Sequence, residues 1–121
     1  MKRDYSLKGR ELYKHVNRKG TKFRGNGIEI IFLKLDNNHQ EVQEVDFFLK
    51  AGIVLNRKYG KAVERNHTKR RIRSILDEVI KTFNSGYCLI IRPGFRFKNM
   101  EYSEQKKDLL HLLQKTGIME R

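Results

Sequence analysis

The amino-acid sequence predicts a single α+β domain, an α/β sandwich in which helices pack on a small sheet. Its 121 residues suffice for one modest hydrophobic core, and we find no internal repeat or interdomain linker in it. Apolar residues recur at helical spacing over residues 61–83, whereas residues 28–35 and 87–92 are rich in side chains typical of strands. The predicted order is helix, two or three strands, long helix, strand and helix.

An arm and a short helix are the first predicted elements. Residues 1–6 are expected to form a loose arm. A helix is expected over residues 9–18, because Leu12 and Val16 are four positions apart and would face a core together. Gly20 is expected to stop this helix.

A hairpin is predicted next. Residues 22–27 read as a basic loop, residues 28–35 as a strand and residues 36–40 as a turn. A returning strand is expected across residues 42–56. This stretch is long for one regular strand, so a bulge or bend is expected near residues 51–52.

The carboxy-terminal half is predicted to hold a long helix, a central strand and a last helix. One apolar stripe marks the helix over residues 61–83: Ile72, Ile75, Leu76, Val79, Ile80 and Phe83. Gly86 suits a left-handed helix end, and the nearly continuous apolar run 87–92 suits a central strand. A helix is expected over residues 102–115, with a loose tail over residues 117–121.

Positive charge is concentrated at the start of the long helix. The formal net charge is +13, and residues 57–73 hold eight Lys or Arg against the single acid Glu64, which gives +7. Like charges on one helical face repel by roughly a few tenths of a kcal/mol per close pair, and a polyanion would relieve that repulsion. The sequence therefore favours nucleic acid as the partner over an anionic membrane surface. A solvated charged face is the alternative interpretation.

A catalytic set of side chains is not evident in the sequence. The four histidines, His15, His39, His67 and His111, lie in different segments without metal-ligand spacing, and His15 and His111 are expected to be exposed on helices. Cys88 is the only cysteine, which excludes a disulfide framework and fits a reducing cytoplasm. No apolar run approaches the roughly eighteen residues of a membrane span. A protein-only nuclease is therefore not expected.

Residues 58–73 resemble the signature helix of the bacterial ribonuclease P protein subunit. The fixed positions of that pattern match at Lys58, Gly60, Ala62, Val63, Arg65, Asn66, Lys69, Arg70, Ile72 and Arg73. His67 departs from the pattern, because the family has a second Arg there. Tyr13 matches an aromatic position of the family's first helix, whereas Asn17 stands at its second. The resemblance implies a ribosomal-protein-like fold with a left-handed β-α-β crossover around the signature helix.

The resemblance also implies a function. It is that of an RNA-binding subunit of ribonuclease P, which assists the catalytic RNA in removing the 5′ leader from precursor tRNA. It does so by binding the leader and stabilising the RNA. The catalytic centre and its required Mg²⁺ would belong to the RNA, so the cytoplasmic chain would be inactive alone. Catalytic RNA and precursor tRNA are the implied partners, with no membrane and no protein partner. The alternative is a basic ribosomal or nucleoid-type protein with no role in catalysis.

Two sets of contact residues are expected on this basis, with no catalytic residue and no protein metal ligand. The contacts expected with the catalytic RNA are Arg57, Lys58, Lys61, Arg65, Asn66, His67, Lys69, Arg70 and Arg73. Tyr13, Phe32 and Asn56 are expected to bind the leader, with Leu33 as the alternative to Phe32. Arginine can grip phosphate bidentately, and aromatic rings can stack unpaired bases.

Overall fold

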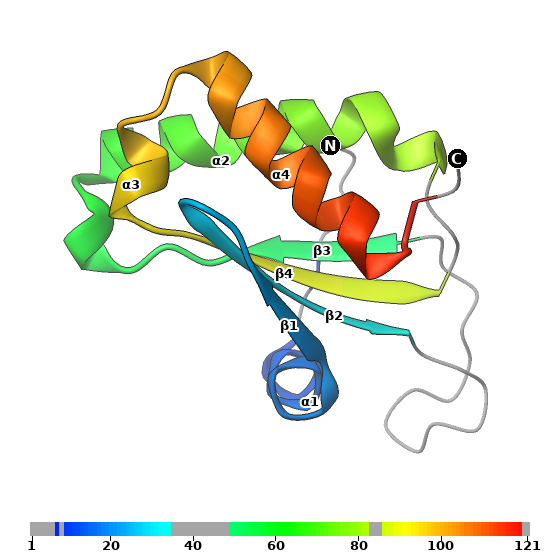
Figure 1. Ribbon diagram of the computed structural model, residues 1–121. Helices are drawn as coiled ribbons and strands as arrows, with labels where there is room; N and C mark the ends of the chain where they lie inside the picture. The colour runs from blue at the N-terminus through cyan, green and yellow to red at the C-terminus, as the bar shows by residue number, and fades with distance from the viewer. Residues whose placement is uncertain (1–6, 8, 35–48, 83–85, 120–121) are drawn as a thin grey trace.

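A mixed sheet of four strands, in the order β1-β2-β4-β3, carries helices on both faces (Figure 1). The computed structural model describes residues 7, 9–34, 49–82 and 86–119. The strands are β1 Thr21–Arg24, β2 Ile28–Lys34, β3 Leu49–Ile53 and β4 Tyr87–Pro93. The helices are α1 Arg10–Lys19, α2 Ala62–Val79, α3 Phe95–Lys98 and α4 Tyr102–Thr116, with short 3-10 turns η2 Arg57–Tyr59 and η3 Ile80–Thr82. The predicted α+β class is confirmed.

The two faces of the sheet bury different sets of side chains, because successive strand residues point to opposite sides. Ile30 and Ile91 point to the face covered by α2 and α4, where Ile72 and Leu109 join them in the larger core. The opposite face carries α1 and a smaller core: Leu7, Val16, Ile31, Cys88 and Ile90. Figure 1 shows α2 and α4 on one side of the sheet and α1 on the other.

Strand β4 is central, as its nearly continuous apolar run predicts. It pairs antiparallel with β2 and parallel with β3, so β3, α2 and β4 form one β-α-β unit. This unit contains residues 57–73, which we call the basic segment, as the family resemblance implies. The left-handed sense of the connection stays a prediction of that resemblance.

The expected hairpin return is wrong in the part that the structure describes. β3 pairs with β4 and not with β2, because β4, with its nearly continuous apolar run, takes the position between them. The expected bulge is absent from residues 51–52, since Ala51 pairs with Leu89 and Gly52 with Ile90 in unbroken register. The predicted turn over residues 36–40 lies outside the described residues, as does the arm over residues 1–6.

The expected loop over residues 22–27 is also wrong at its start, because residues 21–24 form strand β1 and pair with β2. Only the Gly25-Asn26-Gly27 tip is a turn. This turn is held by Asp108 on α4. The Asp108 carboxylate accepts hydrogen bonds from the backbone N–H groups of Asn26 and Gly27, each at 3.2 Å. The partner that orders this segment is thus about eighty residues away, beyond the reach of local sequence patterns.

Two further expectations fail because tertiary packing overrides them. His15 is buried, at 2% exposure, rather than exposed on α1. Ile118, in the tail expected to be loose, is fully buried in the larger core, and Met119 packs beside it. The other helix predictions are close: α2 begins at Ala62 and its 3-10 extension ends at Thr82, and exposed His111 lies on α4.

Candidate nucleic-acid interface

The junction between β3 and α2 is fixed by Tyr59, which is almost fully buried. Its hydroxyl shares a hydrogen bond of 2.8 Å with the buried Thr68 hydroxyl on the second turn of α2. Its backbone N–H donates to Oδ1 of Asn56 at 3.1 Å, which caps the η2 turn. Burial is the largest influence on the Tyr59 phenol and raises its pKa. These contacts fix Tyr59 and the start of α2 against each other.

Glu64, the only acid of the basic segment, is used to fix the start of α2. Its carboxylate accepts the Lys61 backbone N–H at 3.0 Å and pairs with Lys98 Nζ at 2.8 Å. The hydrogen bond from Lys98 is the first cause of the lowered pKa of Glu64. Lys98 also donates to the Tyr59 carbonyl at 2.9 Å. A Cβ at Gly60 would approach Glu64 Oε1 to 2.6 Å, so this position accepts only glycine without rearrangement.

Two arginines of the segment face inward and stabilise the protein. Arg65 is half-buried, and its Nη1 donates to the Gly60 carbonyl at 2.6 Å. Arg71 donates to Oε1 of Gln105 on α4 at 2.9 Å, and its guanidinium lies 5.5 Å from the Tyr102 ring centre. The sequence does not separate these arginines from their neighbours, because the charge run looks uniform.

The remaining expected contact residues make an exposed cationic face, which we call the basic face. Its exposed members are Arg57, Lys58, Lys61, Asn66, His67, Arg70 and Arg73, with half-buried Lys69 among them. Among the described residues, no carboxylate pairs with the cations of this face.

The residues expected at the leader are not brought together as a group. Tyr13 is half-buried on the α1 face, where its side chain packs against Gly52, and burial raises its pKa. Phe32 points to the opposite face, where its ring lies 5.6 Å from that of Phe23. Leu33, the alternative at this position, shares the face of Tyr13. Strand alternation separates the two neighbours, and the sequence alone does not show which of them faces α1.

Asn17 and Arg92 are a polar contact on the α1 face that the sequence did not reveal. Asn17, at the family's second aromatic position, accepts a hydrogen bond from Arg92 Nη2 at 3.0 Å. Arg92 also lies 3.8 Å from Glu29 on β2. Arg92 lies within β4, and the hydrogen bond joins residues 75 positions apart, so no local sequence pattern reveals it.

Metal-ligand groups of three or more His, Cys, Asp or Glu do not occur among the residues that the structure describes. Within the same residues, no helix is long and apolar enough to cross a membrane.

Comparison with known proteins shows that this chain is similar to members of one family. The family model described as ribonuclease P matches residues 1–117. The ribonuclease P protein component of a Geobacillus species is 30% identical over all of this chain and 97% of its own length. That of Oceanobacillus iheyensis is 29% identical, over 98% of this chain and 92% of its own.

Solved structures show the same fold. The RNase P protein of Staphylococcus aureus superposes with a TM-score of 0.81, at 20% identity, over 95% of this chain and 97% of that one. The protein of Thermotoga maritima gives a TM-score of 0.76, at 22% identity, over 91% and 96% of the two chains.

Proposed function

The chain belongs to the ribonuclease P protein family, and we propose that it holds the RNA of that enzyme on the basic face of α2. As a protein component it is a subunit of a ribonucleoprotein endoribonuclease and has an RNA partner. The observation that carries the proposal is the division of charge in the segment. Glu64, Arg65 and Arg71 are used within the fold, whereas the exposed cations have no described carboxylate partner.

The basic face suits a folded RNA for a physical reason. Cations that contact phosphates release condensed counterions, and this release supplies affinity. Arg70 and Arg73 are three positions apart on α2, so they would present two guanidinium groups to neighbouring phosphates. The family match favours this role over that of a ribosomal or nucleoid protein.

We place catalysis, and the Mg²⁺ that it requires, in the RNA. The family resemblance supports this assignment, as does the chemistry of the basic face, whose lysines and arginines offer charge and hydrogen-bond donors to phosphate. The proposed substrate is precursor tRNA, in the cytoplasm. A buried lone thiol, Cys88, is compatible with that reducing compartment.

The α1 face is the proposed binding surface for the 5′ leader. Tyr13 supplies an aromatic ring there, Leu33 apolar surface and Arg92 a cation. Phe32 is removed from this proposal by its position on the other face. Asn56 lies in the segment that leads from β3 to the basic face, and its side chain caps Tyr59.

The test is cleavage of precursor tRNA at low Mg²⁺ by a bacterial ribonuclease P RNA, with and without this chain. We expect the chain to raise the cleavage rate and the affinity for precursor tRNA, and to show no cleavage by itself. Cleavage by RNA-free protein that survives nuclease treatment would place the catalytic centre in the protein instead. No stimulation at any Mg²⁺ concentration would contradict the proposed role.

A further inference from the structure

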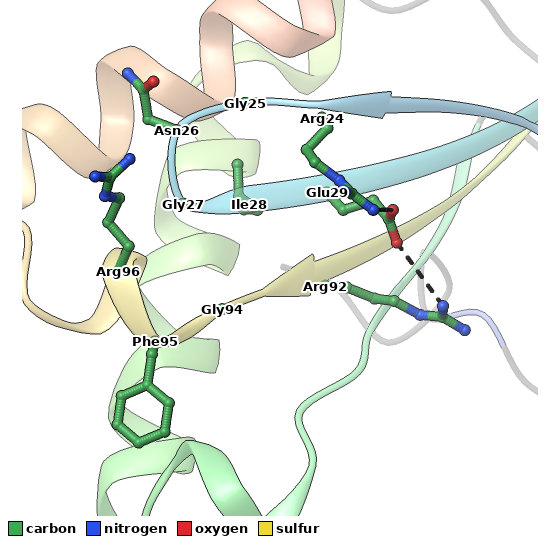
Figure 2. Close-up of a pocket in the computed structure, with 10 residues that line it drawn as sticks. All are labelled: Arg24, Gly25, Asn26, Gly27, Ile28, Glu29, Arg92, Gly94, Phe95 and Arg96. Carbon is green, nitrogen blue, oxygen red and sulfur yellow. Dashed lines mark hydrogen bonds and ion pairs between the residues drawn. The ribbon is translucent and has the colours of Figure 1, made fainter.

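A groove lies where the β1–β2 turn meets the end of β4 and the start of α3 (Figure 2). Figure 2 shows Arg24 and Arg92 on one side of it, beside Glu29, and Arg96 on the other. Phe95 extends from its lower edge. None of these side chains belongs to the basic face of α2, so the groove is a second cationic feature of the molecule.

The charge of this groove is positive and only partly compensated. Three arginines line it against one acid, Glu29, so its side chains carry a net formal charge of +2. Glu29 is shared, at 3.2 Å from Arg24 and 3.8 Å from Arg92. Arg96 is exposed and forms no ion pair within the described segments. An exposed guanidinium without a carboxylate partner is suited to binding a phosphate.

Phe95 gives the groove an aromatic surface. Its side chain is 60% exposed, and it has no aromatic partner among the described residues. Lys98 Nζ lies 5.4 Å from its ring centre, which adds a cation beside the ring. A single exposed apolar residue needs no special explanation. An exposed ring beside cations, at the edge of a groove, is the combination with which proteins stack the bases of single-stranded nucleic acid.

We propose that this groove binds one unpaired nucleotide of RNA, with the base stacked on Phe95 and a neighbouring phosphate held by Arg96. The inference rests on the proposed function, since the RNA comes either from the leader or from the catalytic RNA. The continuity of the groove with the α1 face favours the leader. Arg92 lines the groove and also bonds Asn17 of α1, so the groove extends the surface that carries Tyr13. The nucleotide would then lie beyond those in contact with α1.

The experiment uses the chain reconstituted with a bacterial ribonuclease P RNA and precursor tRNAs whose leaders differ in length. The variants are Phe95→Ala, Phe95→Leu, Phe95→Tyr and Arg96→Ala, with Lys115→Ala at an exposed position of α4 as the charge control. A base stack of 1–3 kcal/mol predicts a loss of roughly 5- to 150-fold in affinity for long-leader substrate in the Ala and Leu variants. The Tyr variant keeps the ring and should bind as wild type does. Arg96→Ala should reduce the salt slope by about one unit.

The comparison of leader lengths distinguishes the two possible sources of the nucleotide. A loss that appears only with long leaders identifies the leader, and photocrosslinking of a thiouridine in that leader should then map to the peptide holding Phe95. A loss in affinity for the RNA subunit, independent of leader length, identifies the catalytic RNA. Wild-type affinity for both RNAs in the Phe95→Ala and Arg96→Ala variants overturns the inference, as does wild-type affinity in Phe95→Leu.

Failure of the groove and failure of the proposed function give different results. If wild-type chain stimulates cleavage and the groove variants match it, only the groove inference falls. If wild-type chain gives no stimulation, the proposed function falls, and the groove inference with it. Thermal unfolding of each variant checks folding, and an exposed Phe95 should change the midpoint little.

Discussion

Gly52 shows how one residue in β3 is determined by a side chain from another element. A Cβ built at this position would coincide with the Tyr13 hydroxyl of α1 and lie 2.7 Å from the ring carbon that bears it. The glycine is therefore explained by close approach of an aromatic ring. The sequence suggested a bulge there, because a strand glycine is compatible with either cause.

Gly52→Ala should destabilise the protein by about 1–3 kcal/mol, because an added methyl group overpacks a filled site. Urea unfolding measures this loss. Tyr13→Ala removes the clashing side chain, so the double variant should be more stable than the sum of the two single losses predicts. Strictly additive losses would show that the two positions do not meet.

Helix α2 carries two kinds of arginine, those that bond within the protein and those that face solvent, and the sequence does not distinguish them. Arg65 and Arg71 bond to Gly60 and Gln105 and so contribute to folding, whereas Arg70 and Arg73 point to solvent. The inner stripe runs through Thr68 to Ile72 and Ile75. Mutations along one helix should therefore separate stability from RNA affinity.

Replacing Arg70 and Arg73 with Ala should flatten the slope of log affinity against log salt by roughly 1–2 units, because each phosphate contact contributes about 0.7–0.9. The free energy of unfolding should change little, since both side chains are exposed. Binding of the catalytic RNA at several salt concentrations gives the slope. The double variant Lys107→Ala and Lys115→Ala, at two exposed positions of α4, is the control of equal charge. An unchanged slope in the Arg70 and Arg73 variant would locate the RNA elsewhere.

His67→Arg adds one cation to the basic face and restores the family pattern. RNA binding should tighten, and the salt slope should steepen by up to about one unit. The same salt titration measures the affinity and the slope, with His111→Arg at an exposed position of α4 as the matched control. Equal tightening in both variants would mean that only net charge matters.

The whole molecule should lose stability at alkaline pH through its core thiol. Burial raises the pKa of Cys88 from 9.0 to about 12, and nearby Lys50 acts weakly in the opposite direction. A pKa that is raised on folding stabilises the protein fully below the unfolded value and less as pH rises towards the folded one. The urea midpoint should therefore fall above about pH 9, and Cys88→Ala should flatten that fall. An equally steep fall in the variant would assign the effect to Tyr13 and Tyr59, whose pKa values are also raised.

Local periodicity was enough to predict α1, β2, α2, β4 and α4, because each carries its own apolar pattern. It did not predict the pairing of β3 with β4, which depends on strands separated by a whole helix. For the candidate site, helical spacing identified the exposed cations of α2. It could not show the inward bonds of Arg65, or the ion pair that Lys98 makes with Glu64 from 34 positions away.

The central place of β4 has a consequence for the order of events during synthesis. β2 and β3 both pair with β4, so neither has this neighbour until residues 87–93 have left the ribosome. Until then the finished α2 has no complete sheet beneath it, although its cations have already emerged. Contacts this distant in sequence make folding slow relative to helix formation. A nascent chain thus exposes the cations of α2 before it has the sheet that orients them. On the proposed function, we expect assembly with RNA to follow synthesis of the carboxy-terminal third.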